Sequence, residues 1–374
     1  MKFLIQQDKL LGALNSLSGC VGNKNAMPIL DKVLFQASDK GVIMIASNGE
    51  LEQRVKIPVE ASVLEVEEKG KATIPHRKML DIARNLNSDR LITIKTEQNE
   101  TIMTSGRSRF KMKGDEPREF PFIPDLNEPV SISVSAEVLS RSIGLVGPSM
   151  ANQDVRYYLN GMFVEVLDGI LTFIGTDGHR LNSVHSTAFQ SSADFSRIVP
   201  RNAVQEMDKF IKGLSEVTLQ FDGSHMRIVH STGEITTKLV DGRYPDYRRV
   251  IPAKTTGDTV ITVDKGDLSS ALSRVAILAN EKFRGVKVSL KSGELLLSSN
   301  NPQQEEAEES LDVDQSGSDI EIGFNVQYLM QAIMLCEDNL VRIHLSGSSK
   351  AGLVESVESQ SDYTAANVVM PIRL

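Results

Sequence analysis

The sequence predicts an α+β protein made of three tandem repeats, each with two helices and antiparallel strands. Three observations predict this class. A short apolar strand pattern, a polar capping residue and an amphipathic helix recur three times in the same order. A second amphipathic helix recurs deeper in each segment, and short alternating apolar runs lie between the helices. We therefore place the repeats at residues 1–127, 128–254 and 255–374.

The first helix of each repeat follows a residue that can accept hydrogen bonds from free helical N–H groups. These candidate caps are Asp8, Ser135 and Asp264, which are 127 and 129 residues apart. The second helix follows Pro75 and Pro200 in the first two repeats and Phe324 in the third. Proline suits a helix entrance because the N–H that it lacks would have no partner there.

Turn signals repeat with the helices. Ser47-Asn48-Gly49, Thr176-Asp177-Gly178 and Asn300-Asn301-Pro302 are 129 and 124 residues apart. No long flexible linker separates the segments, so we expect the three domains to be rigidly docked.

Composition excludes several classes of protein. Of 374 residues, 40% are hydrophobic and 24% are charged, as in a folded globular protein. No run approaches the 18 apolar residues of a membrane span, and the first residues do not resemble a secretory signal. Cys20 and Cys336 cannot build a disulfide framework or a zinc quartet. We expect a cytoplasmic protein with no membrane partner.

The net charge of −8 is unevenly distributed. Residues 1–127 carry 19 Lys and Arg against 17 Asp and Glu, and residues 128–254 carry 13 against 14. Residues 255–374 carry 9 against 18, so the acidity belongs almost wholly to the last third. A chain that is basic at one end and acidic at the other can associate head to tail.

The sequence carries no convincing catalytic motif. Asp177 and His179 could be taken for an acid–base pair, but their segment is a turn signal with no nucleophile motif beside it. There is no G-x-x-x-x-G-K-[ST] loop and no H-x-x-x-H spacing. We expect no catalytic residue, no cofactor and no metal.

Long blocks of the chain resemble the beta subunit of bacterial DNA polymerase III, the beta sliding clamp family. The matching blocks include QDVRYYLNGM (153–162), TDGHRL (176–181), KLVDGRYPDYRRV (238–250), NNPQQEEAEE (300–309) and VVMPIRL (368–374). The resemblance implies three DNA-clamp domains per subunit and a head-to-tail homodimer that closes a ring around duplex DNA. It also implies a non-catalytic processivity factor, with helices lining the hole.

The resemblance assigns three groups of residues. Positions matching DNA contacts are Lys24, Arg77, Gln153, Tyr157 and Tyr158. We add Arg201 because it is one of the basic residues on the predicted helices that could attract phosphates. Positions matching the hydrophobic pocket for partner peptides are Leu159, Thr176, Gly178, His179, Arg180, Leu181, Pro245, Arg249, Val250, Val368, Met370, Pro371, Ile372, Arg373 and Leu374. Positions matching the dimer interface are Lys78, Arg107, Phe110, Ile277, Leu278, Glu305, Glu306, Glu308 and Glu309.

The implied partners are double-stranded DNA without sequence preference, a second copy of the chain, the polymerase alpha subunit and the clamp-loader delta subunit. Other polymerases and repair proteins would use the same pocket. Tyr157 and Tyr158 could lie along a sugar–phosphate backbone or stack on an unpaired base. The alternative is that they form a half-buried aromatic pair at a strand start and have no role in DNA binding. The alternative function is a clamp-like scaffold that binds peptides without encircling DNA.

Overall fold

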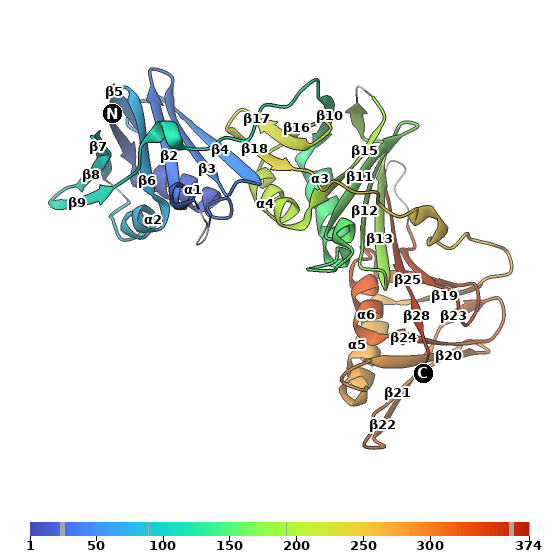
Figure 1. Ribbon diagram of the computed structural model, residues 1–374. Coiled ribbons are helices and arrows are strands. Elements are labelled where there is room, and N and C mark those ends of the chain that lie inside the picture. The colour runs from blue at the N-terminus through green and yellow to red at the C-terminus, as the bar shows by residue number, and fades with distance from the viewer. Residues whose placement is uncertain (23–26, 89, 192, 359–362, 374) are drawn as a thin grey trace. The chain divides into compact units, whose positions relative to one another are not determined.

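The structure is a computed structural model that describes residues 1–22, 27–88, 90–191, 193–358 and 363–373. Lys24 and Leu374 therefore lie outside the described residues. The chain forms two compact units (Figure 1). The first contains Met1–Ser140, Gln190–Ala193 and Asn202–Val240, and the second contains Arg141–Phe189, Asp194–Arg201 and Asp241–Leu374. In the described residues each unit has a five-stranded and a nine-stranded sheet.

The first predicted repeat contains the helices α1 (Gln7–Leu17) and α2 (His76–Arg84). Its strands are β1 (Lys2–Gln6), β2 (Lys32–Ser38), β3 (Gly41–Ser47), β4 (Leu51–Pro58), β5 (Leu64–Glu68), β6 (Gly70–Pro75), β7 (Leu91–Glu97), β8 (Glu100–Ser105) and β9 (Ser108–Lys113).

The second predicted repeat contains α3 (Ala136–Val146) and α4 (Arg201–Ile211). Its strands are β10 (Val130–Ser135), β11 (Gly161–Leu167), β12 (Ile170–Thr176), β13 (Arg180–Ser186), β14 (Phe189–Ser191), β15 (Phe195–Pro200), β16 (Glu216–Phe221), β17 (His225–His230) and β18 (Gly233–Lys238).

The third predicted repeat contains α5 (Lys265–Val275) and α6 (Val326–Met334). Its strands are β19 (Thr259–Asp264), β20 (Gly285–Lys291), β21 (Glu294–Asn300), β22 (Glu306–Asp312), β23 (Asp314–Ser316), β24 (Ile320–Asn325), β25 (Leu340–Leu345), β26 (Gly352–Ser356), β27 (Tyr363–Val369) and β28 (Pro371–Ile372). The α+β class and the paired helices are confirmed, whereas the repeat boundaries near Asn127 and Lys254 stay a prediction.

Two of the three predicted caps are confirmed. The Asp264 carboxylate accepts hydrogen bonds from the N–H groups of Gly266 and Asp267, and Ser135 Oγ accepts one from Val138 N–H. The prediction for Asp8 is wrong, because α1 begins one residue earlier, at Gln7, and its N-cap Gln6 makes no side-chain cap. Asp8 lies in the first turn, where its charge still favours the helix N-terminus.

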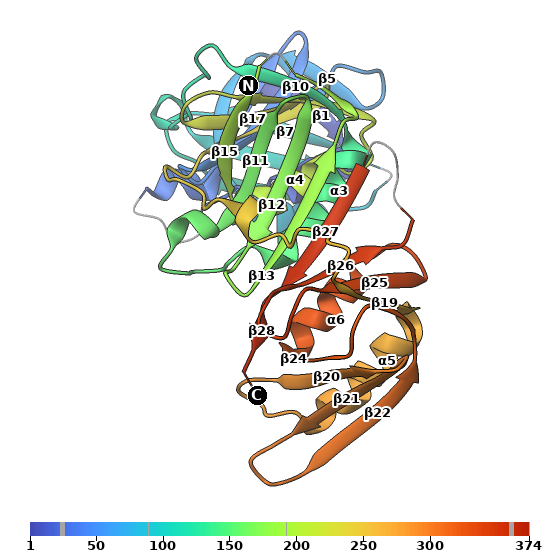
Figure 2. The same cartoon turned by 90° about the vertical axis from the view of Figure 1, so that its right-hand side faces the viewer.

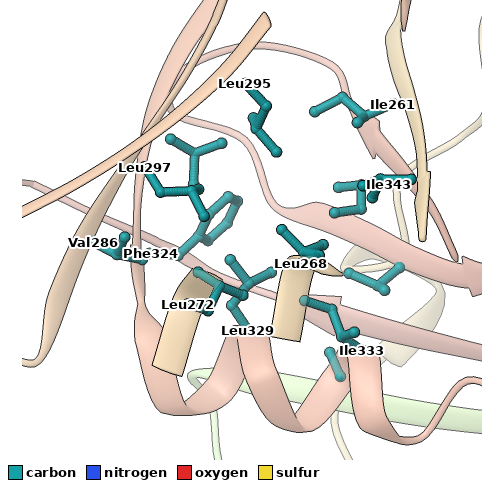
Figure 3. Packing of buried hydrophobic residues seen from close by; sticks show 14 of the residues in the cluster. Ile261, Leu268, Leu272, Val286, Leu295, Leu297, Phe324, Leu329, Ile333 and Ile343 are labelled. Carbon is teal, nitrogen blue, oxygen red and sulfur yellow. The ribbon is translucent and has the colours of Figure 1, made fainter. Parts of the chain in front are cut away.

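The core of the third repeat illustrates how the helices and sheets pack (Figure 3). Leu268 and Leu272 of α5 and Leu329 and Ile333 of α6 are almost completely buried against Phe324 of β24. The alternating strand residues Val286, Val288 and Leu290 point into this core, whereas Lys287 and Ser289 between them point outward. The sequence pattern thus fixes which sheet face meets the helices.

Strand pairing joins consecutive repeats within each unit. In the first unit β4 pairs with β18, and Gln53 stands opposite Ile235. In the second unit β13 pairs with β27, and Asn182 stands opposite Asn367. Figure 2 shows green β13 beside red β27 in one continuous sheet. We call these two pairings the repeat seams.

The strands β9 and β22 each form one edge of a five-stranded sheet, and β5 and β28 form the other edges. The described sheet order is β5-β1-β7-β8-β9 in the first unit and β22-β21-β20-β24-β28 in the second. An edge strand presents a row of backbone N–H and C=O groups that can pair with another strand.

The cap geometry predicts different effects for two aspartates. Asp264→Ala should lower the free energy of unfolding of the third repeat by about 1 kcal/mol, because α5 loses its N-cap acceptor. Asp8→Ala should cost less than Asp264→Ala, since only a charge near the helix dipole is lost. Amide hydrogen exchange of α5 and α1 measures both effects, and an equal loss in the two variants would contradict the cap assignment.

Candidate functional sites

The strands β12, β13 and β27 bring part of the predicted peptide pocket together. Thr176 stands opposite Leu181, and Leu181 stands opposite Val368 on the other side. All three side chains are buried. Beyond the end of β27, Met370 N–H donates a hydrogen bond of 2.9 Å to the carbonyl of His179. The TDGHRL and VVM segments therefore lie side by side.

The turn between β12 and β13 is fixed by its own polar groups. The Asp177 carboxylate accepts hydrogen bonds from the backbone N–H groups of His179 (2.9 Å) and Arg180 (3.1 Å). It also forms an ion pair of 3.0 Å with Arg180 Nε. Asp177 therefore holds the turn, and the His179 ring lies parallel to Tyr328 with their centroids 6.2 Å apart. The contacts of Asp177 and His179 are therefore with other groups and not with each other.

Arg180 connects the turn with α6. Its guanidinium donates to the carbonyl of Pro148 (2.6 Å) and to the side-chain oxygen of Gln331, and it lies over the Tyr328 ring at 4.5 Å. These partners fix the position of the Arg180 guanidinium, so a ligand beside it would meet a rigid, planar cation.

The other pocket positions differ in exposure. Leu159, in the 3₁₀ turn η4 (Tyr157–Leu159), is buried, whereas Arg249 is 85% exposed and pairs with Asp246 at 2.9 Å. Val250 and Met370 are each 37% exposed. Pro371 and Ile372 form β28 beside β24, and Pro245 and Arg373 are exposed. Their assembly with Leu181 and Val368 into one pocket stays a prediction.

An arginine that the sequence analysis missed tethers the loop with the predicted DNA-contact residues to the pocket turn. Arg156 pairs with Asp154 at 2.8 Å and donates to the carbonyl of Asp177 at 2.9 Å. The hydrogen bonds from Arg156 lower the pKa of Asp154 to about 2. Gly178 has a φ of +87°, and a Cβ there would stand 2.7 Å from the Arg156 guanidinium. The backbone conformation therefore favours glycine, and a larger residue would also displace the Arg156 guanidinium from its present position.

The predicted DNA-contact residues occupy different surroundings. Gln153 has a φ of 57°, and Tyr157 is 55% exposed with its ring edge-on to Tyr158 at 5.6 Å. Arg77 is exposed in the first turn of α2. Arg201 begins α4, and its guanidinium donates to the carbonyls of Gly147 (3.3 Å) and Met150. It therefore has a structural role whether or not it contacts DNA.

The predicted interface residues lie on or near the two edge strands. In the first unit Phe110 is half-buried on β9, Arg107 is exposed in the turn before it, and Lys78 is exposed on α2. Arg109 and Lys111, which were not assigned from the sequence, are exposed on either side of Phe110. In the second unit Ile277, in the 3₁₀ turn η6 (Ala276–Leu278), is 77% exposed, and Leu278 beside it is half-buried.

The four glutamates do not share one role. Glu306 and Glu308 point outward from β22, whereas Glu309 points to the opposite face and pairs with Arg274 of α5 at 2.6 Å. The hydrogen bond from Arg274 lowers the pKa of Glu309. Glu305 precedes the strand and accepts a hydrogen bond from Asn301. Glu306 and Glu308 are thus the outward-facing acidic pair.

Among the described residues, no group of three or more His, Cys, Asp or Glu side chains could hold a metal ion. Neither Cys20 nor Cys336 is exposed, and burial raises the pKa of the Cys336 thiol to about 12. In the part of the chain that the structure describes, no helix is long and apolar enough to cross a membrane.

Three family models match consecutive parts of the chain. They describe the N-terminal domain of the DNA polymerase III beta subunit (residues 1–124), its central domain (133–246) and its C-terminal domain (248–373). A beta sliding clamp from Vibrio cholerae is 40% identical over 380 residues, and one from Escherichia coli is 37% identical over 375 residues. Each alignment covers all of this chain and all of the relative.

Solved structures agree with these relatives. A DNA polymerase sliding clamp from Pseudomonas aeruginosa, crystallised with a ligand, is 36% identical and has a TM-score of 0.94, with complete coverage of both chains. The P. aeruginosa clamp bound to griselimycin has the same identity, TM-score and coverage.

The Arg156 tether predicts a measurable coupling. Gly178→Ala should lower the free energy of unfolding of the second unit by about 1 kcal/mol or more, because alanine is strained at this φ and its Cβ meets the guanidinium. In an Arg156→Ala background the cost should shrink, since only the backbone strain remains. Denaturant unfolding of the four variants gives the double-mutant cycle, and additive costs would exclude the contact.

Proposed function

Because this chain belongs to the family of bacterial DNA polymerase III beta subunits, it is a DNA sliding clamp and processivity factor, and we propose how its own residues close the ring and recruit partners. The observation that carries the proposal is the pair of repeat seams. Both seams use the same strand positions, and β22 and β9 are the equivalent strands that remain at sheet edges.

The equivalence can be followed through the strand pairs. Ala46, Gly175 and Ser299 are equivalent, because each is the residue just before a turn signal. Their partners across the hairpin are therefore also equivalent, and these partners are Gln53, Asn182 and Ala307. Phe3, Ile132 and Ile261 are equivalent, because they lie at intervals of 129 residues. The strand pairs that cross each sheet from these residues end at Phe110, Ile235 and Asn367, which are therefore equivalent on β9, β18 and β27.

This equivalence gives a register for ring closure. Since Gln53 faces Ile235 and Asn182 faces Asn367, Ala307 should face Phe110 of a second copy. The antiparallel neighbours are then Lys111 opposite Glu306 and Arg109 opposite Glu308. The opposite charges fix the register and speed the encounter, while Phe110, Ile277 and Leu278 supply apolar burial. Lys78, Arg107, Glu305 and Glu309 form the surrounding rim.

The ring holds DNA by topology and by weak phosphate attraction. Arg77, Gln153, Tyr157 and Tyr158 are exposed or half-exposed and would contact the sugar–phosphate backbone. The proposed DNA contacts also include Lys24, which lies outside the described residues. They include Arg201 as well, through the part of its side chain that is accessible. Contacts of this kind are independent of sequence, so they permit sliding.

Partner proteins would be tethered through the surface around Thr176, Leu181, Val368 and Met370. An apolar floor with an exposed methionine accepts varied leucine and phenylalanine anchors, and Arg180 orients the peptide. We propose the polymerase alpha subunit, the clamp-loader delta subunit and repair proteins as its ligands. The clamp itself is non-catalytic and cytoplasmic in this proposal. The alternative, a scaffold that does not encircle DNA, is not favoured by the clamp relatives.

A topological test separates encirclement from contact. After loading on nicked circular DNA by a clamp loader with ATP, the protein should dissociate when the circle is linearised, because it can slide off the ends. Gel filtration at a salt concentration that abolishes direct binding measures retention. Equal retention on circular and linear DNA would reject the encirclement proposal.

The proposed register is tested by cross-linking. Lys111→Cys combined with Glu306→Cys should form an intersubunit disulfide, because opposed antiparallel residues bring their Cα atoms within disulfide range. Lys111→Cys combined with Ser310→Cys is the matched control, since those positions would be about 13 Å apart along the strand. Non-reducing electrophoresis measures covalent dimer, and equal yields for both pairs would overturn the register.

A further inference from the structure

The outer sheet face of the first two repeats is covered by the segment that leads to the next repeat. In the first repeat Leu34 of β2 and Ile45 of β3 are buried in a cluster with Phe120 of that segment. In the second repeat Phe163 of β11 stacks on Tyr244, with the ring centroids 4.6 Å apart and the planes 13° from parallel. In both repeats an aromatic residue followed by proline covers the same strand positions.

In the described residues, the equivalent positions of the third repeat line a hollow. Leu34, Phe163 and Lys287 are equivalent because each is the third residue of β2, β11 and β20. Their neighbours on the next strand are Ile45, Ile174 and Ser298. Lys287 and Ser298 line a hollow of about 590 Å³ together with Phe283, Glu308, Glu321 and Ile372.

We propose that this hollow is a docking site for an extended aromatic–proline segment of another protein, bound as the chain's own connecting segments are bound in the first two repeats. The proposal goes beyond the clamp function, because the hollow is centred on Lys287 and Ser298 of β20 and β21, and it shares only Ile372 and Arg373 with the predicted peptide pocket.

The lining residues match such a segment. The Phe283 ring is 62% exposed and offers an aromatic face, while Lys287 offers an ammonium group to the incoming ring. Lys287 lies 3.5 Å from Glu321, and both side chains are largely solvated, at 42% and 65% exposure. Polar residues at positions that are apolar in the other repeats keep the face soluble when it is unoccupied.

The second repeat indicates what should follow the aromatic–proline pair. There, Tyr247 Oη donates a hydrogen bond of 2.8 Å to Glu165, and Arg248 pairs with the same carboxylate. In the hollow Glu321 is the carboxylate available to a tyrosine or arginine, because Glu306 and Glu308 face the second copy in the proposed ring. The occupant is therefore an aromatic–proline segment that carries a tyrosine or a basic residue shortly afterwards.

A peptide of residues 243–250 (RYPDYRRV) is the probe, labelled with fluorescein and added to the full-length dimer. Fluorescence anisotropy should show saturable binding, and the same peptide with both tyrosines replaced by alanine should bind at least tenfold more weakly. Lys287→Phe, which restores the residue of the second repeat, should tighten binding roughly tenfold by adding ring stacking and apolar contact. Phe283→Ala and Ser298→Trp should weaken it, the latter by filling the hollow.

Met370→Ala is the control, since it alters the other proposed pocket and should leave binding of this probe unchanged. Light scattering of each variant verifies that the dimer is retained. Absence of binding to both the unmodified protein and Lys287→Phe would overturn the proposal. Loss of binding in Met370→Ala alone would also overturn it, by assigning the peptide to the other pocket. Neither result depends on whether the ring encircles DNA.

Discussion

The rest of the structure depends on the need of edge strands for partners. Each repeat has edge strands with backbone groups that need partners, and the chain satisfies four of these strands by pairing β4 with β18 and β13 with β27. The same constraint leaves β9 and β22 as complementary edges, one with exposed Arg109 and Lys111 and the other with exposed Glu306 and Glu308. In the ring that we propose, closure repeats between chains a strand pairing that the chain already makes twice within itself.

The seams also determine where binding surfaces can form. The Thr176–Leu181–Val368 surface exists because β13 and β27 come from different repeats and bring two short apolar segments into register. Arg180 and Asp177 then stiffen its rim through local hydrogen bonds and through contacts with α6. The outer sheet faces of the repeats differ for another reason. A few outward-pointing residues, such as Phe163 and Lys287, decide whether a face packs against its own chain. One repeated scaffold therefore presents chemically different surfaces.

Most of the fold could be predicted from the sequence, because periodic patterns report helices and strands and the repeat spacing reports their order. The errors arise where a single side chain chooses between local partners. Asp8 looks like Asp264 in the sequence, but α1 begins before it. The contacts of Arg201 with the carbonyls of Gly147 and Met150 gave no signal, because these residues lie 54 and 51 positions earlier, and its contact with DNA stays a prediction. Arg109 and Lys111 could have been found from the alternating basic pattern of β9 once that strand was recognised as an edge. Arg156 gave no signal beyond its neighbour Asp154, because its second partner, the Asp177 carbonyl, is 21 residues away.

The long-range pairing of the seams has a consequence for biosynthesis. Val55 of β4 pairs with Gly233, so its partner is translated 178 residues later. At a translation rate of roughly 5–20 residues per second, β4 is without its partner strand β18 for about 10–35 s. The nascent strand carries Glu52, Arg54 and Lys56 during that interval, and such charges oppose edge-to-edge aggregation. The protein therefore acquires its completed sheets late in synthesis, and in the proposed ring β9 and β22 gain their partners only when a second finished chain arrives.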